Sequence, residues 1–283
     1  GPDRSLRCNG NATSGIDRVK IRVDNPSDSQ PGPPADVGAA DFTMEGWVLA
    51  PAAENTAPDV TCGANTAWRD GNVLFDRDRF NQDRDYGVSL AGGRVIFGVS
   101  GDGTGDTTIC GTSAITDGAW HHIAIQRRRS DGWMWLYVDG VLQAEADGPD
   151  GDISYPDDGV PGNYCGATGD QPCTASDPFL VIGAEKHDLD PSTHPSFSGW
   201  VDGVRISNTL RYTADFTRPT AAFVSDAYTV GLYLFDEGSS TAANDVSGFA
   251  AGPSNGALSI GGNPAGPVWS TEWPFGPPRQ VER

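Results

Sequence analysis

The sequence lacks the features of a membrane-spanning or nucleic-acid-binding protein. No apolar run approaches the roughly 18 residues that cross a bilayer. Lysine and arginine together number 19, against 38 aspartates and glutamates, so the net charge is −19 and the basic stripe that binds phosphates is missing. We therefore expect neither membrane insertion nor a nucleic-acid partner. Such an acidic surface suits divalent cations and neutral or cationic ligands, or serves solubility alone.

Two further absences concern sorting and zinc. No secretion signal is present, but the chain begins with Gly1-Pro2, which is typical of the scar that a protease leaves when it removes a purification tag. The first residues therefore carry no information about localisation. No Cys-x-x-Cys pair occurs among the five cysteines, so we expect no zinc site.

The cysteines favour two disulfides. Cys165 and Cys173 flank a short polar loop and are expected to close it, which leaves Cys62 and Cys110 for a second bridge and Cys8 unpaired. On chain entropy alone the smaller loop contributes about 2.5 kcal/mol and the larger about 4 kcal/mol. Disulfides imply an oxidising compartment, so we expect a secreted or cell-surface protein. The alternative is five free thiols in a cytosolic protein.

Glycine (37) and proline (21) are abundant and helical apolar periodicity is missing, so many short strands joined by turns are expected. The pattern has no break that would indicate a second domain. It favours one all-β domain, a two-sheet antiparallel sandwich, at residues 16–262. Residues 1–15 are expected to be a cleavage scar and a flexible segment, and residues 263–283 a Pro-rich tail or linker. The predicted strands are 16–23 (an edge strand), 42–49, 73–76, 86–90, 94–100, 120–127, 133–138, 141–146, 179–183, 199–207 and 231–235.

Four segments resemble a known family. Residues 117–140 contain Asp-Gly-Ala-Trp-His-His-Ile-Ala and end in Leu-Tyr-Val-Asp-Gly; the others are 41–48 (Asp-Phe-Thr-Met-Glu-Gly-Trp-Val), 197–208 and 232–238 (Leu-Tyr-Leu-Phe-Asp-Glu-Gly). In this order they resemble the signature of laminin G-like domains of the concanavalin A-like lectin/glucanase superfamily. The resemblance implies a jelly roll of two antiparallel sheets. Members commonly bind glycans or proteins, often with calcium.

Histidines and carboxylates give little sign of catalysis. His121 and His122 are neighbours on a predicted strand, so they point to opposite faces and cannot act together on one substrate. We expect structural roles for both, with at least one ring packed beside Trp120 and its nitrogens bonded to backbone. Glucanases of the superfamily carry a strand with paired carboxylates, whereas Glu45 and Glu145 each stand alone on their predicted strands. The sequence therefore favours a binding module over an enzyme.

Two acidic segments are suited to calcium. Segment 75–86 carries four aspartates whose side chains alternate with arginines, and segment 182–190 concentrates charged groups at the exit of a predicted strand. Alternation places aspartates two residues apart on one side of an extended chain and the arginines on the other. One such loop cannot supply six to eight oxygens, so the second segment is expected to complete the site. The alternative is a solvated surface of Asp–Arg pairs. The expected ligands are Asp76, Asp78, Asp85, Glu185 and Asp188.

Aromatic rings in loops are candidates for ligand contact. Trp133 and Trp135 share one face of a predicted strand, where rings more often belong to the core or its cover. Rings in loops beside the predicted disulfides are expected to be exposed, and the loop at 185–190 adds basic and imidazole groups. The expected ligand-binding residues are Trp68, Tyr164, Lys186 and His187.

Taken together, these features predict a secreted or surface-attached, non-catalytic module that binds a glycan or an extracellular protein with the help of calcium. Two other classes remain open, a glycan-active enzyme and a structural spacer in a multidomain protein. Calcium-dependent glycan binding would favour the module, and release of products from a polysaccharide would favour the enzyme.

Overall fold

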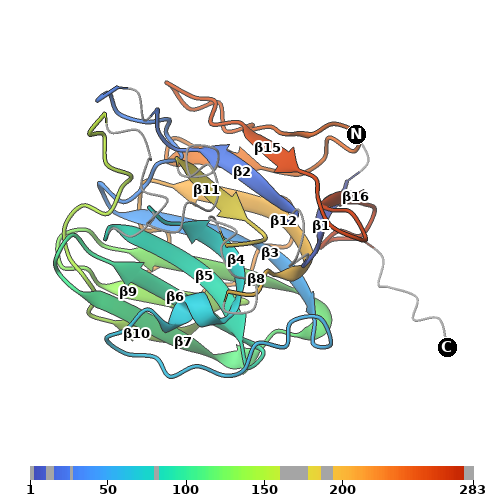
Figure 1. The fold of residues 1–283 in the computed structure, drawn as a ribbon, viewed down its shortest axis with the longest axis horizontal. Helices are drawn as coiled ribbons and strands as arrows, with labels where there is room; N and C mark the ends of the chain where they lie inside the picture. Colours follow the sequence, from blue (N-terminus) through green and yellow to red (C-terminus); the bar gives the residue numbers. More distant parts are fainter. Residues whose placement is uncertain are drawn as a thin grey trace.

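The chain folds into two antiparallel β-sheets packed face to face (Figure 1). A computed structural model describes the protein at residues 3–10, 16–25, 28–79, 83–159, 178–185 and 194–276. Within these residues each sheet has eight strands, and the strand pairs in the sheets are antiparallel. The expected two-sheet jelly roll is confirmed. No helix of the described part is long and apolar enough to cross a bilayer.

The first sheet, sheet A, holds the segments that carry the family resemblance. Its strands, in spatial order, are β10 (Val141–Ala146), β9 (Met134–Val138), β8 (Asp117–Arg127), β3 (Phe42–Pro51), β12 (Ser198–Ser207), β1 (Ser5–Asn9) and β16 (Val268–Ser270), and β13 (Thr229–Tyr233) also pairs with β12.

The second sheet, sheet B, lies opposite. Its strands, in spatial order, are β14 (Ala242–Ala243), β15 (Gly256–Ser259), β2 (Arg18–Arg22), β11 (Phe179–Ile182), β4 (Asn72–Arg77), β5 (Asp85–Ala91), β6 (Arg94–Ser100) and β7 (Asp106–Ala114).

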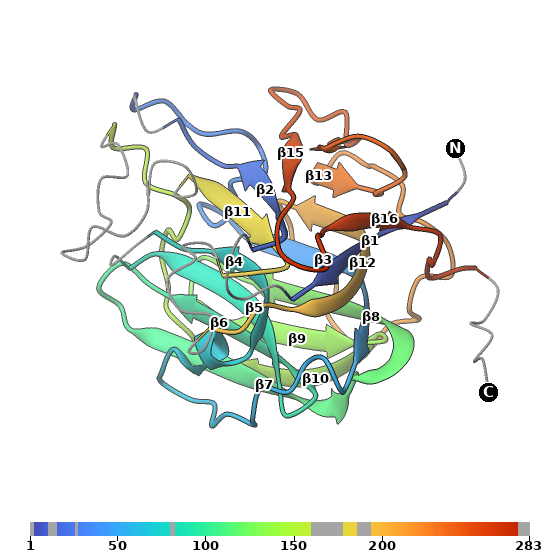
Figure 2. The same cartoon turned by 45° about the vertical axis from the view of Figure 1, so that its right-hand side comes forward.

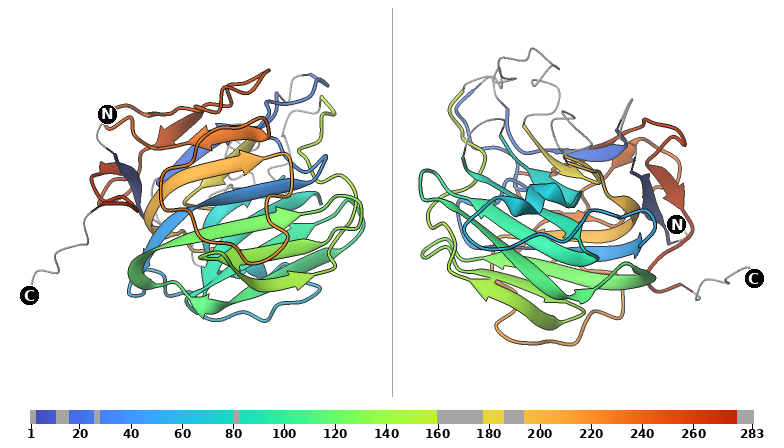
Figure 3. Two further views of the ribbon diagram at one scale, coloured as in Figure 1. Left: turned by 180° about the vertical axis from the view of Figure 1, so that it is seen from behind. Right: turned by 60° about the horizontal axis from the view of Figure 1, so that its bottom comes forward.

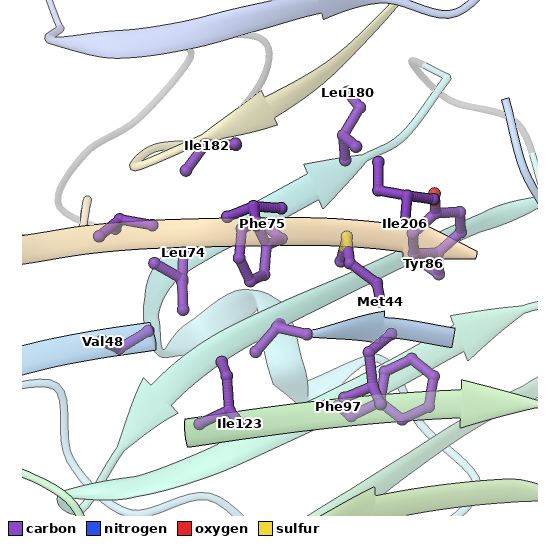
Figure 4. Close-up of a cluster of buried hydrophobic side chains, with 14 of the residues drawn as sticks. Met44, Val48, Leu74, Phe75, Tyr86, Phe97, Ile123, Leu180, Ile182 and Ile206 are labelled. Atoms are coloured by element: carbon purple, nitrogen blue, oxygen red, sulfur yellow. The ribbon is translucent and has the colours of Figure 1, made fainter. Parts of the chain in front are cut away.

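The core lies between the two sheets (Figure 4). Strand side chains alternate between faces, so apolar residues two apart on β3 and β8 meet apolar residues from sheet B. Every side chain labelled there is at most 2% exposed. The labelled residues are Met44, Val48, Ile123 and Ile206 from sheet A, and Leu74, Phe75, Tyr86, Phe97, Leu180 and Ile182 from sheet B.

The outer face of sheet A is covered as well. Segment 208–228 crosses this face (Figure 3, left). The Gln126 amide donates to the Tyr212 carbonyl oxygen at 2.9 Å, and the ring of Phe216 meets the buried ring of His122 edge-on at 5.8 Å. This cover explains why the strand at 117–127 looks apolar on both sides.

The glycines in the hairpin turns determine the backbone conformation of those turns. Asp139 and Gly140 both have positive φ, 50° and 82°, as a type I′ turn between β9 and β10 requires. Gly92 and Gly93 repeat this pattern between β5 and β6. In the turn between β8 and β9 only Gly132 has positive φ, so this turn is not of type I′.

The structure corrects the expected boundaries of the domain. Strand β1 lies within residues expected to be flexible, and it pairs with β12 and with β16 near the other end of the chain (Figure 2). The sandwich therefore extends beyond 16–262 at both ends. Strand β7 was missed because its polar sequence, Asp-Thr-Thr-Ile-Cys-Gly-Thr-Ser-Ala, has few apolar residues. Strand β2 is not an edge strand, since it lies between β15 and β11.

One of the two expected disulfides can be compared with the structure. Cys62 and Cys110 are bonded, which confirms that prediction, and the bridge ties the loop before η1 (Ala67–Asp70) to β7. Cys8 is a buried free thiol, and burial raises its pKa far above the ordinary value. Cys165 and Cys173 lie outside the described residues, so their pairing stays a prediction.

Candidate functional site

Three carboxylates meet on the outer side of sheet B. Asp76 lies in β4, Asp78 follows that strand, and Glu185 follows β11, which pairs with β4. One oxygen from each lies within 4.8 Å of the others, and Asp76 is buried. The sequence predicted this grouping from the alternation of strand side chains and from the position of Glu185 at a strand exit.

The spacing of these oxygens suits a divalent cation. Calcium lies about 2.3–2.6 Å from its ligands, so oxygens on opposite sides of one ion are about 5 Å apart. Three carboxylate oxygens can therefore share one ion, with water or carbonyl oxygens completing its shell. The guanidinium of Arg18 is close enough for Glu185 and Asp76 to influence its pKa, which burial lowers to about 10. Despite burial, the charges of Asp78 and Asp76 also raise the pKa of Arg69. Arg18 and Arg69 are thus the cations with which a metal would compete.

The two neighbouring arginines, Arg77 and Arg79, bind groups outside the three carboxylates. Arg77 donates to the carbonyl oxygens of Arg84 and Ile153. Arg79 pairs with Asp158 at 2.8 Å. Both arginines therefore have partners outside the group of three carboxylates.

A cavity of about 780 Å³ opens beside the cluster and shares Asp78 with it. This volume lies within the range of ligand sites. Six aspartates and three arginines line it, so its lining carries three more negative than positive charges. The lining residues are Thr66, Arg69, Asp78, Arg79, Asp83, Arg84, Asp85, Ser100, Asp102, Asp106, Pro156 and Asp158.

Strand register sets one wall of this cavity. Asp85 pairs with Ser100 and Ser100 pairs with Asp106, so the three residues form a row across β5, β6 and β7. Asp85 is fully buried and forms an ion pair with Arg69. Burial and the charge of Asp78 raise the pKa of Asp85 to about 7. Asp85 therefore belongs to the cavity wall and lies outside the compact group of three, although the sequence placed it with them.

The expectation that Trp68 is exposed is wrong. Trp68 lies in η1, on the outer face of sheet B, and is 1% exposed (Figure 3, right). A Cβ on Gly87 or Gly98 would lie 2.0 Å from its ring, so these two paired glycines open the slot that the ring fills. The ring cannot serve as an exposed platform; it supports Arg69, whose guanidinium lies 5.5 Å from its centre.

The two histidines of β8 have structural partners, but these are carboxylates and not the backbone groups expected. His121 contacts Asp139 at 2.7 Å and Asp117 at 3.0 Å, and these carboxylates raise its pKa despite its partial burial. His122 is fully buried and contacts Glu45 at 3.0 Å.

Several residues of the candidate site fall outside this description, and others were missed. Tyr164, Lys186, His187 and Asp188 lie outside the described residues, so their roles stay predictions. Asp83 lies in the acidic segment 75–86 but was not among the expected ligands, and the sequence did not indicate Arg69, Asp102, Asp106 or Asp158 as parts of a site. The glycine-rich segment at 101–106 was a usable signal, because it connects two strands of the wall and carries two aspartates.

Residues 27–167 match a laminin G family profile described as the concanavalin A-like lectin/glucanases superfamily. Among curated proteins, none matches this chain. Among solved structures, the chain is similar to a heptameric SAP-like pentraxin from Limulus polyphemus, with 15% identity, a TM-score of 0.45 and coverage of 75% of this chain and 78% of the pentraxin. It is also similar to domains LG4-5 of the mouse laminin α1 chain, with 15% identity, a TM-score of 0.44 and coverage of 77% of this chain. The chain spans 47% of that laminin fragment. Segment 27–167, which lies within the two-sheet jelly roll, therefore belongs to the laminin G-like domains of the concanavalin A-like lectin/glucanase superfamily.

Proposed function

We propose that this protein is a calcium-assisted binding module whose ligand site is the cavity beside Asp76, Asp78 and Glu185. The observation that carries the proposal is the meeting of these three carboxylates within 4.8 Å at the border of the 780 Å³ cavity. An ion there would neutralise Asp78, which lines the cavity, and would hold the segments after β4 and β11 together. The ligand would then meet a preformed surface, which lowers the entropy lost on binding.

A non-catalytic role is supported by the state of the strand carboxylates. Glu45 is fully buried and accepts hydrogen bonds from His122, Tyr212 and Arg205, so it has no access to substrate. Glu145 is exposed on β10 and accepts a bond from the Trp133 indole at 3.1 Å. The two carboxylates therefore lie in different environments, and neither is placed as one member of an acid–nucleophile pair.

A secreted or cell-surface location is supported by the bridge between Cys62 and Cys110, because such bonds persist in oxidising compartments. Calcium at extracellular concentrations would keep a weak site of this kind filled.

The calcium proposal is tested by thermal unfolding. An ion bound only by the folded state stabilises it by RT ln(1 + [Ca]/Kd), which is about 2.7 kcal/mol at one hundred times Kd. We expect the Tm to rise with calcium and to fall with a chelator. Asp78→Asn with Glu185→Gln should abolish this response, since both changes keep side-chain size and remove charge.

Asp102→Asn with Asp106→Asn serves as the matched control. These residues line the same cavity but lie outside the compact group, so the variant should keep the calcium response. A Tm that is indifferent to calcium, or a response that survives loss of Asp78 and Glu185, would show that these carboxylates are only a surface balanced by Arg18.

A further inference from the structure

We infer that the cavity on the outer face of sheet B binds a basic peptide segment of a protein partner, through lysine or arginine side chains. The inference rests on the proposed function in so far as it assigns the ligand to the same cavity. It goes further because it chooses between a glycan and a protein. Three observations carry it: the balance of charge in the lining, the spread of the carboxylates, and the polar atoms left without partners.

The arginines of the lining are already paired. Arg69 pairs with Asp85, Arg79 with Asp158, and Arg84 with Asp152, which does not line the cavity. In the described part of the chain, three other lining carboxylates form no ion pair, and two of them are at the exposed rim. These three are Asp83, Asp102 and Asp106. A cation bound by Asp76, Asp78 and Glu185 would not neutralise the charges of these three carboxylates. The cavity therefore keeps an excess of negative charge.

The spread of these carboxylates argues against a second metal ion. Within the described residues, only Asp76, Asp78 and Glu185 bring three ligand atoms within 4.8 Å of one another. The remaining carboxylates are distributed around a cavity of about 780 Å³. A single ion cannot contact them together, whereas a peptide with several separated cationic side chains can.

Buried atoms of the wall also lack partners. Asp85 is fully buried, and its Oδ1 has no hydrogen-bond partner, while its other oxygen is held by Arg69. The Nε–H groups of Arg69 and Arg84, both lining residues, are buried donors without an acceptor. An unmade bond of this kind is costly, so the wall favours a ligand that brings both donors and acceptors. Once these side chains turn toward the cavity, a basic peptide supplies an ammonium or guanidinium donor for the carboxylate and carbonyl oxygens for the arginines.

The experiment measures binding of a fluorescent peptide of alternating glycine and lysine, by anisotropy, in saturating calcium and again with a chelator. A chain of net charge −19 attracts any polycation weakly, so a charge-matched control is essential. The cavity variant is Asp102→Asn with Asp106→Asn. The control is Asp131→Asn with Asp147→Asn, which removes the same charge from exposed residues that do not line the cavity. A glutamate peptide and a neutral oligosaccharide are measured in parallel.

We expect binding to weaken about tenfold in the cavity variant and less than about twofold in the control, because only contacts at the site are lost. Equal weakening in both variants would overturn the inference, since it indicates nonspecific attraction. Binding of the oligosaccharide that the cavity variant abolishes, with no cavity-dependent binding of the lysine peptide, would also overturn it and would assign the site to a glycan. Unfolding curves of both variants verify that they remain folded.

The calcium proposal and the basic-peptide proposal can be contradicted independently of each other. Cavity-dependent peptide binding that is the same with calcium and chelator supports the basic ligand and contradicts the assistance by calcium. A calcium response of the Tm that depends on Asp78 and Glu185, without peptide binding, supports the metal and contradicts the basic ligand.

Discussion

At the scale of single residues, Glu45 shows how one buried charge organises the cover of sheet A. It is fully buried and lies beside His122, Tyr212 and Arg205, with Tyr212 donating at 2.6 Å and Arg205 at 2.9 Å. Burial alone would raise the pKa of Glu45, but the bond from His122 and the charge of Arg205 lower it below the ordinary value. Tyr212 and Arg205 come from different segments, so this carboxylate ties segment 208–228 and β12 to β3.

This arrangement predicts the effect of removing the charge. Glu45→Gln should destabilise the fold by about 3–5 kcal/mol, because the half-buried Arg205 and two further donors lose a fully buried, charged acceptor. Urea unfolding followed by tryptophan fluorescence measures the change. Glu145→Gln is the control: the same substitution at an exposed residue should cost less than about 1 kcal/mol. Equal losses of unfolding free energy at the two positions would show that the hydrogen bonds and ion pair of buried Glu45 do not stabilise the fold more than an exposed carboxylate does.

At the scale of elements, η1 and the strands beneath it form one unit that positions the cavity. The paired glycines of β5 and β6 admit the ring of Trp68, and Arg69 of the same helical turn reaches Asp85 of the cavity wall. The disulfide from Cys62 holds the preceding loop to β7. The position of Arg69 therefore depends on the fit of a neighbouring ring into a slot in the sheet.

Filling that slot should disturb the unit. Gly98→Ala places a Cβ 2.0 Å from Trp68 Cδ1, so we expect a loss of about 1–3 kcal/mol in stability, from overpacking. Combining it with Trp68→Leu should recover part of that loss relative to the sum of the single changes, because the smaller side chain leaves room. The double-mutant cycle in urea unfolding tests this coupling. Strict additivity of the two changes would contradict the proposed packing.

Some strands could be predicted from the sequence alone and others could not. Strands with clear alternation and Gly-containing turns, such as those at 120–127 and 133–138, were predicted close to their observed bounds. β1 was missed because Ser-Leu-Arg-Cys-Asn has only two apolar side chains, and its pairing with β12 and β16 is a tertiary effect. A strand can be recognised from its local sequence only when its own side chains show the apolar alternation of a strand.

The candidate site, too, could be predicted only in part from the sequence. Asp76, Asp78 and Glu185 could be predicted to meet, since the first two alternate on one strand and the third leaves a strand that was expected to lie nearby. The cavity could not, because its walls come from segments of four separate parts of the chain whose contact depends on strand order. Trp68 was misplaced for a related reason: two glycines that lie eleven positions apart in the printed sequence act as one slot only after β5 and β6 pair.

At the scale of the whole molecule, the balance of buried carboxyls sets the pH dependence of stability. Burial raises the pKa of Asp36 and Asp85 to about 7 and that of Asp202 to about 8. A carboxyl whose pKa is higher in the folded state holds its proton more tightly there than in the unfolded chain. Its contribution to stability is complete below the unfolded pKa, near 4, and is lost as the pH rises through the folded pKa.

Other carboxyls act in the opposite direction. The bond from His121 and the charge of Arg218 lower the pKa of Asp139 to about 2 against the effect of burial, and Glu45 is also lowered. Their contribution is present above the unfolded pKa and is lost as the pH falls through the folded pKa. His121, whose pKa is raised by Asp139, stabilises the fold below its unfolded pKa and loses this effect as the pH rises. Because these effects oppose one another, we expect the unfolding free energy to be greatest on the acidic side of neutrality, at about pH 5.

Asp202 gives this expectation a specific test. It is 7% exposed, accepts a bond from the Gly203 amide at 2.8 Å, and lies in a pocket with Asp3, Asp236 and aromatic rings, so its ionised form is poorly stabilised. Between pH 4 and pH 8 such a carboxyl costs up to about 1.4 kcal/mol of stability per pH unit. Asp202→Asn keeps the acceptor and cannot ionise, so the unfolding free energy of the variant should fall less steeply over this window and exceed that of the parent above neutral pH. Urea unfolding at a series of pH values, at constant ionic strength, measures both slopes. Parallel slopes would mean that water or a relaxed backbone stabilises the Asp202 carboxylate, and the acidic optimum would then have to come from Asp36, Asp85 and His121.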